Sequence, residues 1–103
     1  MEMHPAKRVE IIIEAPLSGR LREAIEAVDI TGYTVLPVLG GSGRSGRWNR
    51  DAQVIRSSGM VAVICVIRPE RLEPLLEAAF AVVEEHIGVV NVTDCEVLRA
   101  ERY

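Results

Sequence analysis

The chain has 103 residues, of which 49% are hydrophobic but only 4% aromatic, so residues 1–103 form one domain with an aliphatic core. Its net charge of −3 comes without a long run of one sign, which argues against nucleic acid as the main partner. No long apolar segment begins the chain, so we expect neither a signal peptide nor a membrane span, and a cytoplasmic location.

A strand and a helix are predicted first. Residues 1–7 suggest a short polar arm, and residues 8–14 a central strand, because the second half of that segment is almost continuously apolar. Apolar residues recur at helical spacing between residues 17 and 28, which predicts a helix of about three turns. Ser18 is the predicted N-cap of this helix, and the helix is expected to end near Asp29.

The next predicted strand, residues 33–39, leads into a long loop rich in glycine, residues 40–58. Pro37 places the strand at a sheet edge, because proline cannot donate a hydrogen bond to a neighbouring strand. Between Gly40 and Arg56 the loop carries four arginines against one aspartate. Glycines let main-chain N–H groups approach an anion, and arginines add charged hydrogen bonds. We therefore interpret the loop as a site for a small anion such as a nucleotide; the alternative is a flexible connection.

The glycine spacing of this loop also matches a dinucleotide-binding fingerprint, Gly41-x-Gly43-x-x-Gly46. That fingerprint should follow the first strand of a longer βαβ array and open a helix. Here it follows the second strand, and the residues after it lack a helical pattern. A Rossmann-type nucleotide site is therefore rejected.

The second half of the chain predicts a buried strand, a helix and a last strand. Residues 60–67 contain no polar residue, so this strand lies inside the sheet. Gly88 is expected at the C-terminal end of the second helix, residues 89–98 form the fourth strand, and residues 99–103 are a charged tail. The apolar stripe of the second helix consists of Leu72, Leu75, Leu76, Ala79, Phe80 and Val83.

This β-α-β-β-α-β order predicts an α+β, ferredoxin-like fold, with two helices on one face of a four-stranded antiparallel sheet. Both faces of strand 60–67 are apolar, yet two helices can cover only one face. The other face is large enough to drive association, so we predict a homo-oligomer packed through it.

Catalytic and metal-binding patterns are not found. Cys65 and Cys95 lie in apolar segments without a CxxC spacing, which favours buried, inert thiols over a disulfide or a metal site. His4 and His86 are isolated. No set of residues suggests nucleophilic or acid–base catalysis, so we expect a protein that is not an enzyme and needs no cofactor.

Residues 24–35, followed by Val38-x-Gly40 and Gly43-Arg44, resemble the PII signal-transduction proteins. The resemblance implies a homotrimer that binds adenine nucleotides between subunits, beneath the base of the so-called T-loop, here residues 40–58. It matches Thr34 to an adenine-site threonine, Gly43 and Arg44 to a phosphate-binding pair, Ile87-Gly88 to the start of a second loop, and Arg99 to a phosphate-binding arginine. The nucleotide-binding candidates are Thr34, Gly40, Gly41, Ser42, Gly43, Arg44, Gly88, Arg99 and Arg102; Ser45 and Arg47 are candidates for an anion such as bicarbonate, and Trp48 for contact with a partner protein.

Several departures from typical PII proteins point to one branch of the family. Ser45 replaces a glutamine that helps to hold Mg-ATP and 2-oxoglutarate, residues 50–53 lack the modified tyrosine, and Val89-Val90 shortens the second loop. The chain is similar to the PII-like branch tied to inorganic carbon, which includes carboxysome-associated proteins. This implies binding of ADP or AMP and of bicarbonate, and a target protein that is a transporter or an enzyme.

Other functions on this fold remain as alternatives. The first is a nitrogen-regulatory PII protein that senses ATP, ADP and 2-oxoglutarate, and the second is a trimeric binding protein of the CutA type. An acylphosphatase would need a glycine-rich cradle after the first strand, where Glu14-Ala15-Pro16-Leu17 offers none. An RNA-binding sheet would need more aromatic residues on its strands.

Overall fold

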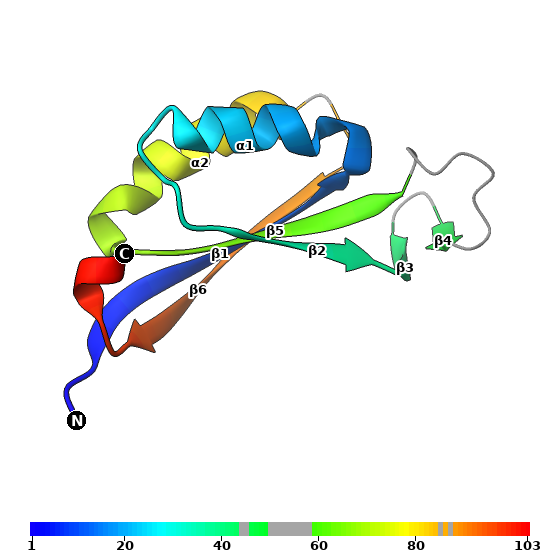
Figure 1. Ribbon diagram of the computed structural model, residues 1–103. Helices are drawn as coiled ribbons and strands as arrows, with labels where there is room; N and C mark the ends of the chain where they lie inside the picture. Colours follow the sequence, from blue (N-terminus) through cyan, green and yellow to red (C-terminus); the bar gives the residue numbers. More distant parts are fainter. Residues whose placement is uncertain (44–45, 50–58, 85, 87) are drawn as a thin grey trace.

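A computed structural model describes the arrangement of residues 1–43, 46–49, 59–84, 86 and 88–103. Its main feature is a four-stranded antiparallel sheet in the order β2-β5-β1-β6, with both α-helices on one face (Figure 1). This arrangement confirms the ferredoxin-like α+β fold, with the apolar strand in the interior and the strand that contains Pro37 at an edge. The strands are β1 (His4–Glu14), β2 (Thr34–Val38), β5 (Met60–Ile67) and β6 (Gly88–Val97).

Each α-helix is entered through a one-turn 3-10 helix that carries a proline in its first two positions. Proline suits this position because its fixed φ is already helical and its missing N–H would have no partner there. The predicted cap at Ser18 is wrong: Ser18 is the first residue of α1, and no side chain caps this helix, because the chain enters it in a helical conformation at Leu17. The helices are η1 (Ala15–Leu17), α1 (Ser18–Glu26), η4 (Pro69–Arg71), α2 (Leu72–Val83) and η5 (Ala100–Arg102).

Three further expectations from the sequence need correction. The N-terminal arm is largely strand, since β1 begins at His4, which pairs with Val97 of β6. Gly88 is the first residue of β6 and pairs with Ile13, so it does not end the helix. Phe80, expected on the buried stripe of the second helix, is 60% exposed, whereas Val82, which was not expected there, is buried. The start of β1, the place of Gly88 and the exposure of Phe80 all depend on pairing and packing with distant segments. The local sequence therefore could not predict them.

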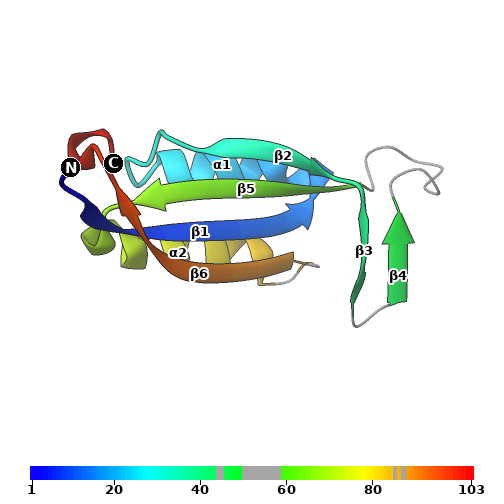
Figure 2. The same cartoon turned by 90° about the horizontal axis from the view of Figure 1, so that it is seen from below.

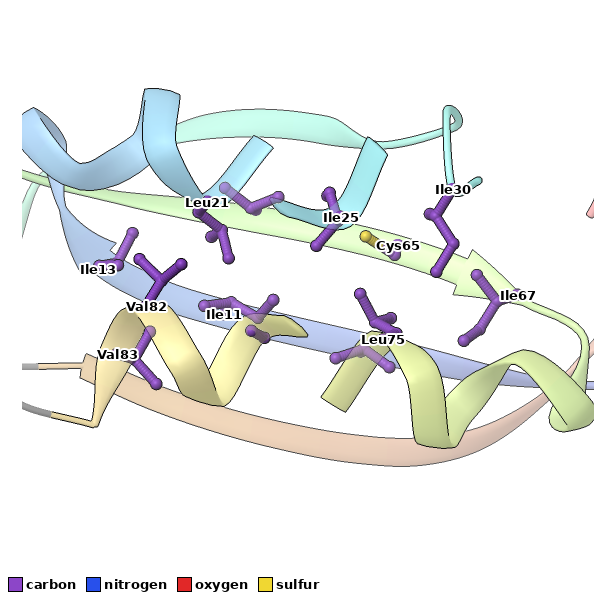
Figure 3. Packing of buried hydrophobic residues seen from close by; sticks show 13 residues of the cluster. Ile11, Ile13, Leu21, Ile25, Ile30, Cys65, Ile67, Leu75, Val82 and Val83 are labelled. Atoms are coloured by element: carbon purple, nitrogen blue, oxygen red, sulfur yellow. The ribbon is translucent and has the colours of Figure 1, made fainter. Parts of the chain in front are cut away.

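The hydrophobic core lies between the two helices and the sheet (Figure 3). Cys65 is buried within it, as predicted, while Cys95 is only partly buried; both are free thiols. The fully buried side chains that β1 and β5 contribute belong to alternate residues, as expected for strands with one face against helices. The largest of the buried side chains are Ile11, Ile13, Leu21, Ile25, Leu75, Val9, Val63 and Cys65.

The glycine-rich segment after β2 contains a small hairpin of its own. β3 (Gly40–Gly43) pairs with β4 (Gly46–Asn49) in a separate two-stranded sheet. The hairpin lies beyond the end of the main sheet, on the side away from both termini (Figure 2). The expectation of an irregular loop throughout residues 40–58 is therefore wrong for its first part, and its remainder lies outside the described residues.

The second face of the main sheet carries an apolar row. Leu36, Ala62, Ile12 and Val89 are successive partners across all four strands. Leu36 is 44% and Val89 is 55% exposed, and no helix among the described segments lies on this face. Ala62, between them, is only 7% exposed, so the exposed apolar surface of this row lies mainly on the two edge strands, where it favours association with another molecule.

A polar group lies next to this row on the same face. Arg8 donates a hydrogen bond from Nη2 to Glu10 Oε2 over 3.3 Å, and Asn91 Nδ2 donates to Glu10 Oε1 over 3.2 Å. The face is thus mixed, and two hydrogen bonds join these three polar side chains.

Candidate functional site

A pocket of about 570 Å³ opens at the end of the sheet where β5 finishes. Three segments far apart in sequence form it: the connection from α1 to β2, the end of β5 with η4, and the C-terminal turn. Figure 2 shows these segments together at the end of the sheet where both termini lie. The lining residues are Asp29, Ile30, Thr31, Gly32, Tyr33, Thr34, Ile64, Val66, Ile67, Arg68, Arg71, Glu101, Arg102 and Tyr103.

Two of the predicted nucleotide-binding residues, Thr34 and Arg102, line this pocket together. Thr34 is the first residue of β2 and pairs with Ile64 of β5, so its place is fixed by the sheet. Arg102 belongs to η5, where its N–H donates to the carbonyl of Arg99 over 3.0 Å. The pocket therefore joins two parts of the chain that the sequence pattern singled out.

The charges of the lining favour an anionic ligand. Three arginines, Arg68, Arg71 and Arg102, are set against two carboxylates, Asp29 and Glu101. Guanidinium groups bind phosphate and carboxylate through paired N–H donors, and they hold their charge at any physiological pH. The lining offers these donors together with hydroxyl groups and an apolar floor of strand residues.

The wall formed by residues 29–33 has no regular secondary structure, but main-chain bonds hold its beginning. Asp29 adopts a left-handed conformation with φ of 64°, and its N–H donates to Glu26 O over 3.0 Å. The N–H of Ile30 donates to Ile25 O over 3.1 Å, and the Ile30 side chain is buried in the core. Asp and Asn are among the non-glycine residues that tolerate this conformation best.

Two side chains tie the same wall to neighbouring elements. Arg71 Nη1 donates to Asp29 O over 2.8 Å, which links the wall to η4. The Tyr33 hydroxyl donates to Glu26 Oε2 over 2.6 Å. That bond to the Glu26 carboxylate raises the pKa of the Tyr33 hydroxyl, because it stabilises the protonated phenol.

The remaining predicted residues do not line this pocket. Arg99 is exposed and lies in the same tail, but outside the lining. Gly40, Gly41, Ser42 and Gly43 form β3, beyond the opposite end of the sheet.

Gly88 also lies toward that opposite end. Its partner Ile13 is next to Glu14, which pairs with Met60, the first residue of β5. Arg44 and Ser45 lie outside the described residues. Arg47 and Trp48 belong to β4, of which only the main chain is described.

Sequence reasoning missed Arg68, Arg71, Tyr33 and Tyr103 as lining residues. A signal for the first two was present, because both closely follow a strand that contains no polar residue, at a turn opened by Pro69. Tyr33 precedes Thr34, and its role depends on Glu26, seven residues away, which no local pattern indicates.

Two absences apply to the part of the chain that the structure describes. These residues hold no group of three His, Cys, Asp or Glu side chains that could bind a metal ion. No helix among them is long and apolar enough to cross a membrane.

Comparisons with known proteins show the family and the fold of the chain. Residues 6–102 match the model of the family described as nitrogen regulatory protein P-II. The comparison with curated protein sequences gave no significant match.

Solved structures resemble the chain over nearly its full length. One is CPII, a nitrogen regulatory PII-like protein from Thiomonas intermedia K12, bound to ADP, AMP and bicarbonate; it is 28% identical, with a TM-score of 0.88 over 98% of this chain and 95% of that one. CPII bound to ADP, AMP and acetate gives 26% identity and a TM-score of 0.82 over 100% and 98%. A PII-like signalling protein from Thermus thermophilus, at 24% identity and a TM-score of 0.77 over 100% and 99%, supports the fold. The chain therefore belongs to the nitrogen regulatory protein P-II family, in its PII-like branch.

Proposed function

We propose that this protein is a homotrimeric, non-enzymatic PII-like regulator of inorganic carbon metabolism that binds ADP or AMP between subunits, together with bicarbonate. The observation that carries the proposal is the pocket in which Thr34 and Arg102 meet two further arginines. The ligands named for CPII, a similar protein over nearly the whole chain, support the same ligands here.

A site between subunits follows from the distribution of the candidate residues. Thr34 pairs with Ile64 in the middle of β5 and shares with Arg102 the pocket at the end of that strand, whereas the β3 glycines and Gly88 lie toward its beginning. In a cyclic oligomer with head-to-tail interfaces, one end of each subunit faces the other end of its neighbour. Such a ring brings both groups to one ligand.

In this arrangement each group has a distinct role. Thr34 and the apolar floor of the pocket hold the base, and Arg102 and Arg99 bind phosphate. From the neighbouring subunit, Arg44 and the main-chain N–H groups of Gly40, Gly41, Ser42, Gly43 and Gly88 complete the phosphate site. Ser45 and Arg47 bind bicarbonate next to it.

The segment 40–58 is the proposed switch. Its β3–β4 hairpin extends past the end of the sheet, where a target protein can reach it. Ligand binding at its base would favour one conformation of the segment over others, which is how a small ligand controls a partner. Trp48 is the proposed contact, and the target is a transporter or an enzyme of inorganic carbon metabolism, in the cytoplasm or at a carboxysome.

Calorimetric titration with ADP, AMP and ATP, each with and without bicarbonate, tests the proposal. We expect ADP or AMP to bind, and bicarbonate to change the affinity for the nucleotide. By linkage, the nucleotide must then change the affinity for bicarbonate by the same factor. If no adenine nucleotide binds, the proposed function is wrong. A response to 2-oxoglutarate in place of bicarbonate would favour a nitrogen-regulatory PII function.

Two variants give this titration a matched control. Arg102→Ala removes a lining guanidinium group, and we expect it to weaken ADP binding about tenfold or more. Arg20→Ala removes the same charge from an exposed position on α1 outside the pocket, and it should bind ADP as the wild type does. Equal losses in both variants would mean that net charge, and not this pocket, governs binding.

A further inference from the structure

One side chain from a distant part of the sequence bonds to the main chain of the pocket wall, residues 29–33. Arg71 belongs to η4, 42 residues further along the chain, and its Nη1 donates to Asp29 O over 2.8 Å. Arg71 is only partly buried and also lines the pocket. The acceptor is a main-chain carbonyl, so the contact depends on the conformation of the wall and not on the aspartate side chain.

Asp29 is where the wall needs such support. Its φ of 64° is the only positive value at a non-glycine residue among the described residues. This conformation is less favourable for an L-residue than the right-handed one, so other bonds must hold it. Two main-chain bonds, from the N–H groups of Asp29 and Ile30 back to α1, hold it on one side, and the Arg71 guanidinium holds the carbonyl on the other.

The wall in turn sets the position of Thr34. Only four residues, Ile30 to Tyr33, separate Asp29 from the first residue of β2, and Ile30 and Tyr33 are packed against the core. A change in the backbone at Asp29 therefore moves the pocket surface directly before Thr34. The Tyr33–Glu26 bond holds the far end of the wall, whereas the Asp29 end is held by its main-chain bonds to α1 and by Arg71.

We propose that Arg71 is a positioning residue that holds the wall of residues 29–33 in the conformation that accepts the nucleotide. This inference rests on the proposed function for its ligand, but the contact itself can be tested without one. The role proposed here for Arg71 is its hydrogen bond to Asp29 O, and the salt comparison below separates this role from a direct contact with phosphate.

Amide hydrogen exchange tests the positioning role in the absence of ligand. In Arg71→Ala, the amides of Asp29 and Ile30 should exchange several-fold faster than in the wild type, because their bonds to α1 open with the wall. The amide of Val63, in the core strand, should be unchanged, which separates a local effect from global loss of stability. Arg71→Lys, which keeps a donor and the charge, should restore part of the protection. Unchanged exchange at Asp29 and Ile30 in Arg71→Ala would overturn the proposal.

ADP affinity at low and high salt then separates positioning from direct charge. We expect Arg71→Ala to weaken ADP binding by about three- to tenfold, which is the range for the loss of one ordinary hydrogen bond that acts indirectly through the wall. Because the bond acts through the wall, the fold-change should stay nearly the same at both salt concentrations, whereas the effect of a direct charge contact with phosphate should become smaller at high salt. Arg20→Ala is again the control.

The outcomes of this test and of the proposed function can be told apart. If wild-type protein binds no adenine nucleotide, the proposed function fails whatever Arg71 does. If wild-type protein binds ADP and Arg71→Ala binds it equally well, or loses affinity only at low salt, the positioning role fails and the proposed function stands.

Discussion

Cys65 shows how one buried side chain links the core to pH. It lies in the middle of β5 with no exposed surface, and burial raises the pKa of its thiol from 9.0 to about 11. The cause is desolvation, since a thiolate in an apolar core has no water to stabilise its charge. The thiol is therefore protonated and unreactive in the folded protein at neutral pH.

A pH dependence of stability follows from this shift. In the unfolded chain the thiol ionises near pH 9, while the folded protein keeps its proton until about pH 11. Between these values the folded state binds more protons, so the free energy of unfolding falls as pH rises. Replacing the thiol in Cys65→Val should make this fall shallower between pH 9 and 11, as measured by urea denaturation. An unchanged slope would show that Cys65 titrates alike in both states.

At the scale of single elements, two glycines have opposite environments. Gly19 lies in α1, and a Cβ added there would meet nothing within 4 Å. Gly88 begins β6, and a Cβ there would lie 3.2 Å from Ile12 O and 3.5 Å from Val83 Cβ. The first position is open, whereas the second is closed by the main chain of β1.

Alanine at these positions should therefore change stability in opposite directions. Gly19→Ala should raise the free energy of unfolding by about 0.4–1 kcal/mol, because alanine favours the helix and restricts the unfolded chain. Gly88→Ala should lower it by about 1 kcal/mol, since a strand carbonyl must shift. Both are measured by denaturation at one protein concentration, because oligomer stability depends on it. A stabilising Gly88→Ala would contradict the close packing of β6 on β1.

The secondary-structure elements also show what local pattern can reveal. The wholly apolar sequence of β5 predicted an interior strand, and Pro37 predicted an edge strand. Both signals lie within a single strand, so the local sequence is enough to detect them. The start of β1 at His4 and the exposure of Phe80 depend on pairing and packing with distant segments. The candidate site divides in the same way: Thr34 and Arg102 were predicted, but Arg71 required the fold to bring η4 against Asp29.

At the scale of the whole molecule, the second face of the sheet is the predicted subunit interface. Its row of Leu36, Ala62, Ile12 and Val89 runs across all four strands. The polar group beside it, Arg8, Glu10 and Asn91, is joined by two hydrogen bonds, so part of its hydrogen-bonding capacity is already satisfied when this face is buried.

Leu36→Glu should therefore disrupt the oligomer. Leu36 is already 44% exposed in the single chain, so a charge there should cost little folding stability, but it would be buried between subunits. Phe80→Glu is the matched control, because Phe80 is 60% exposed on α2, on the helical side. Light scattering should give a smaller particle for Leu36→Glu and a trimer for Phe80→Glu. A trimer in both cases would place the interface elsewhere.

The central claim is that one nucleotide site combines opposite ends of two neighbouring subunits, and mixing two defective variants tests it most directly. Arg102→Ala disables one end and Arg44→Ala the other, so neither trimer alone should bind ADP tightly. The two variants are then unfolded and assembled together in equal amounts. In each mixed trimer, one interface joins the unchanged Arg102 of one subunit to the unchanged Arg44 of its neighbour. Calorimetry should then recover tight binding at about a quarter of the sites. If the site lay within one chain, every site would keep its defect, and the mixture would bind no better than the separate variants.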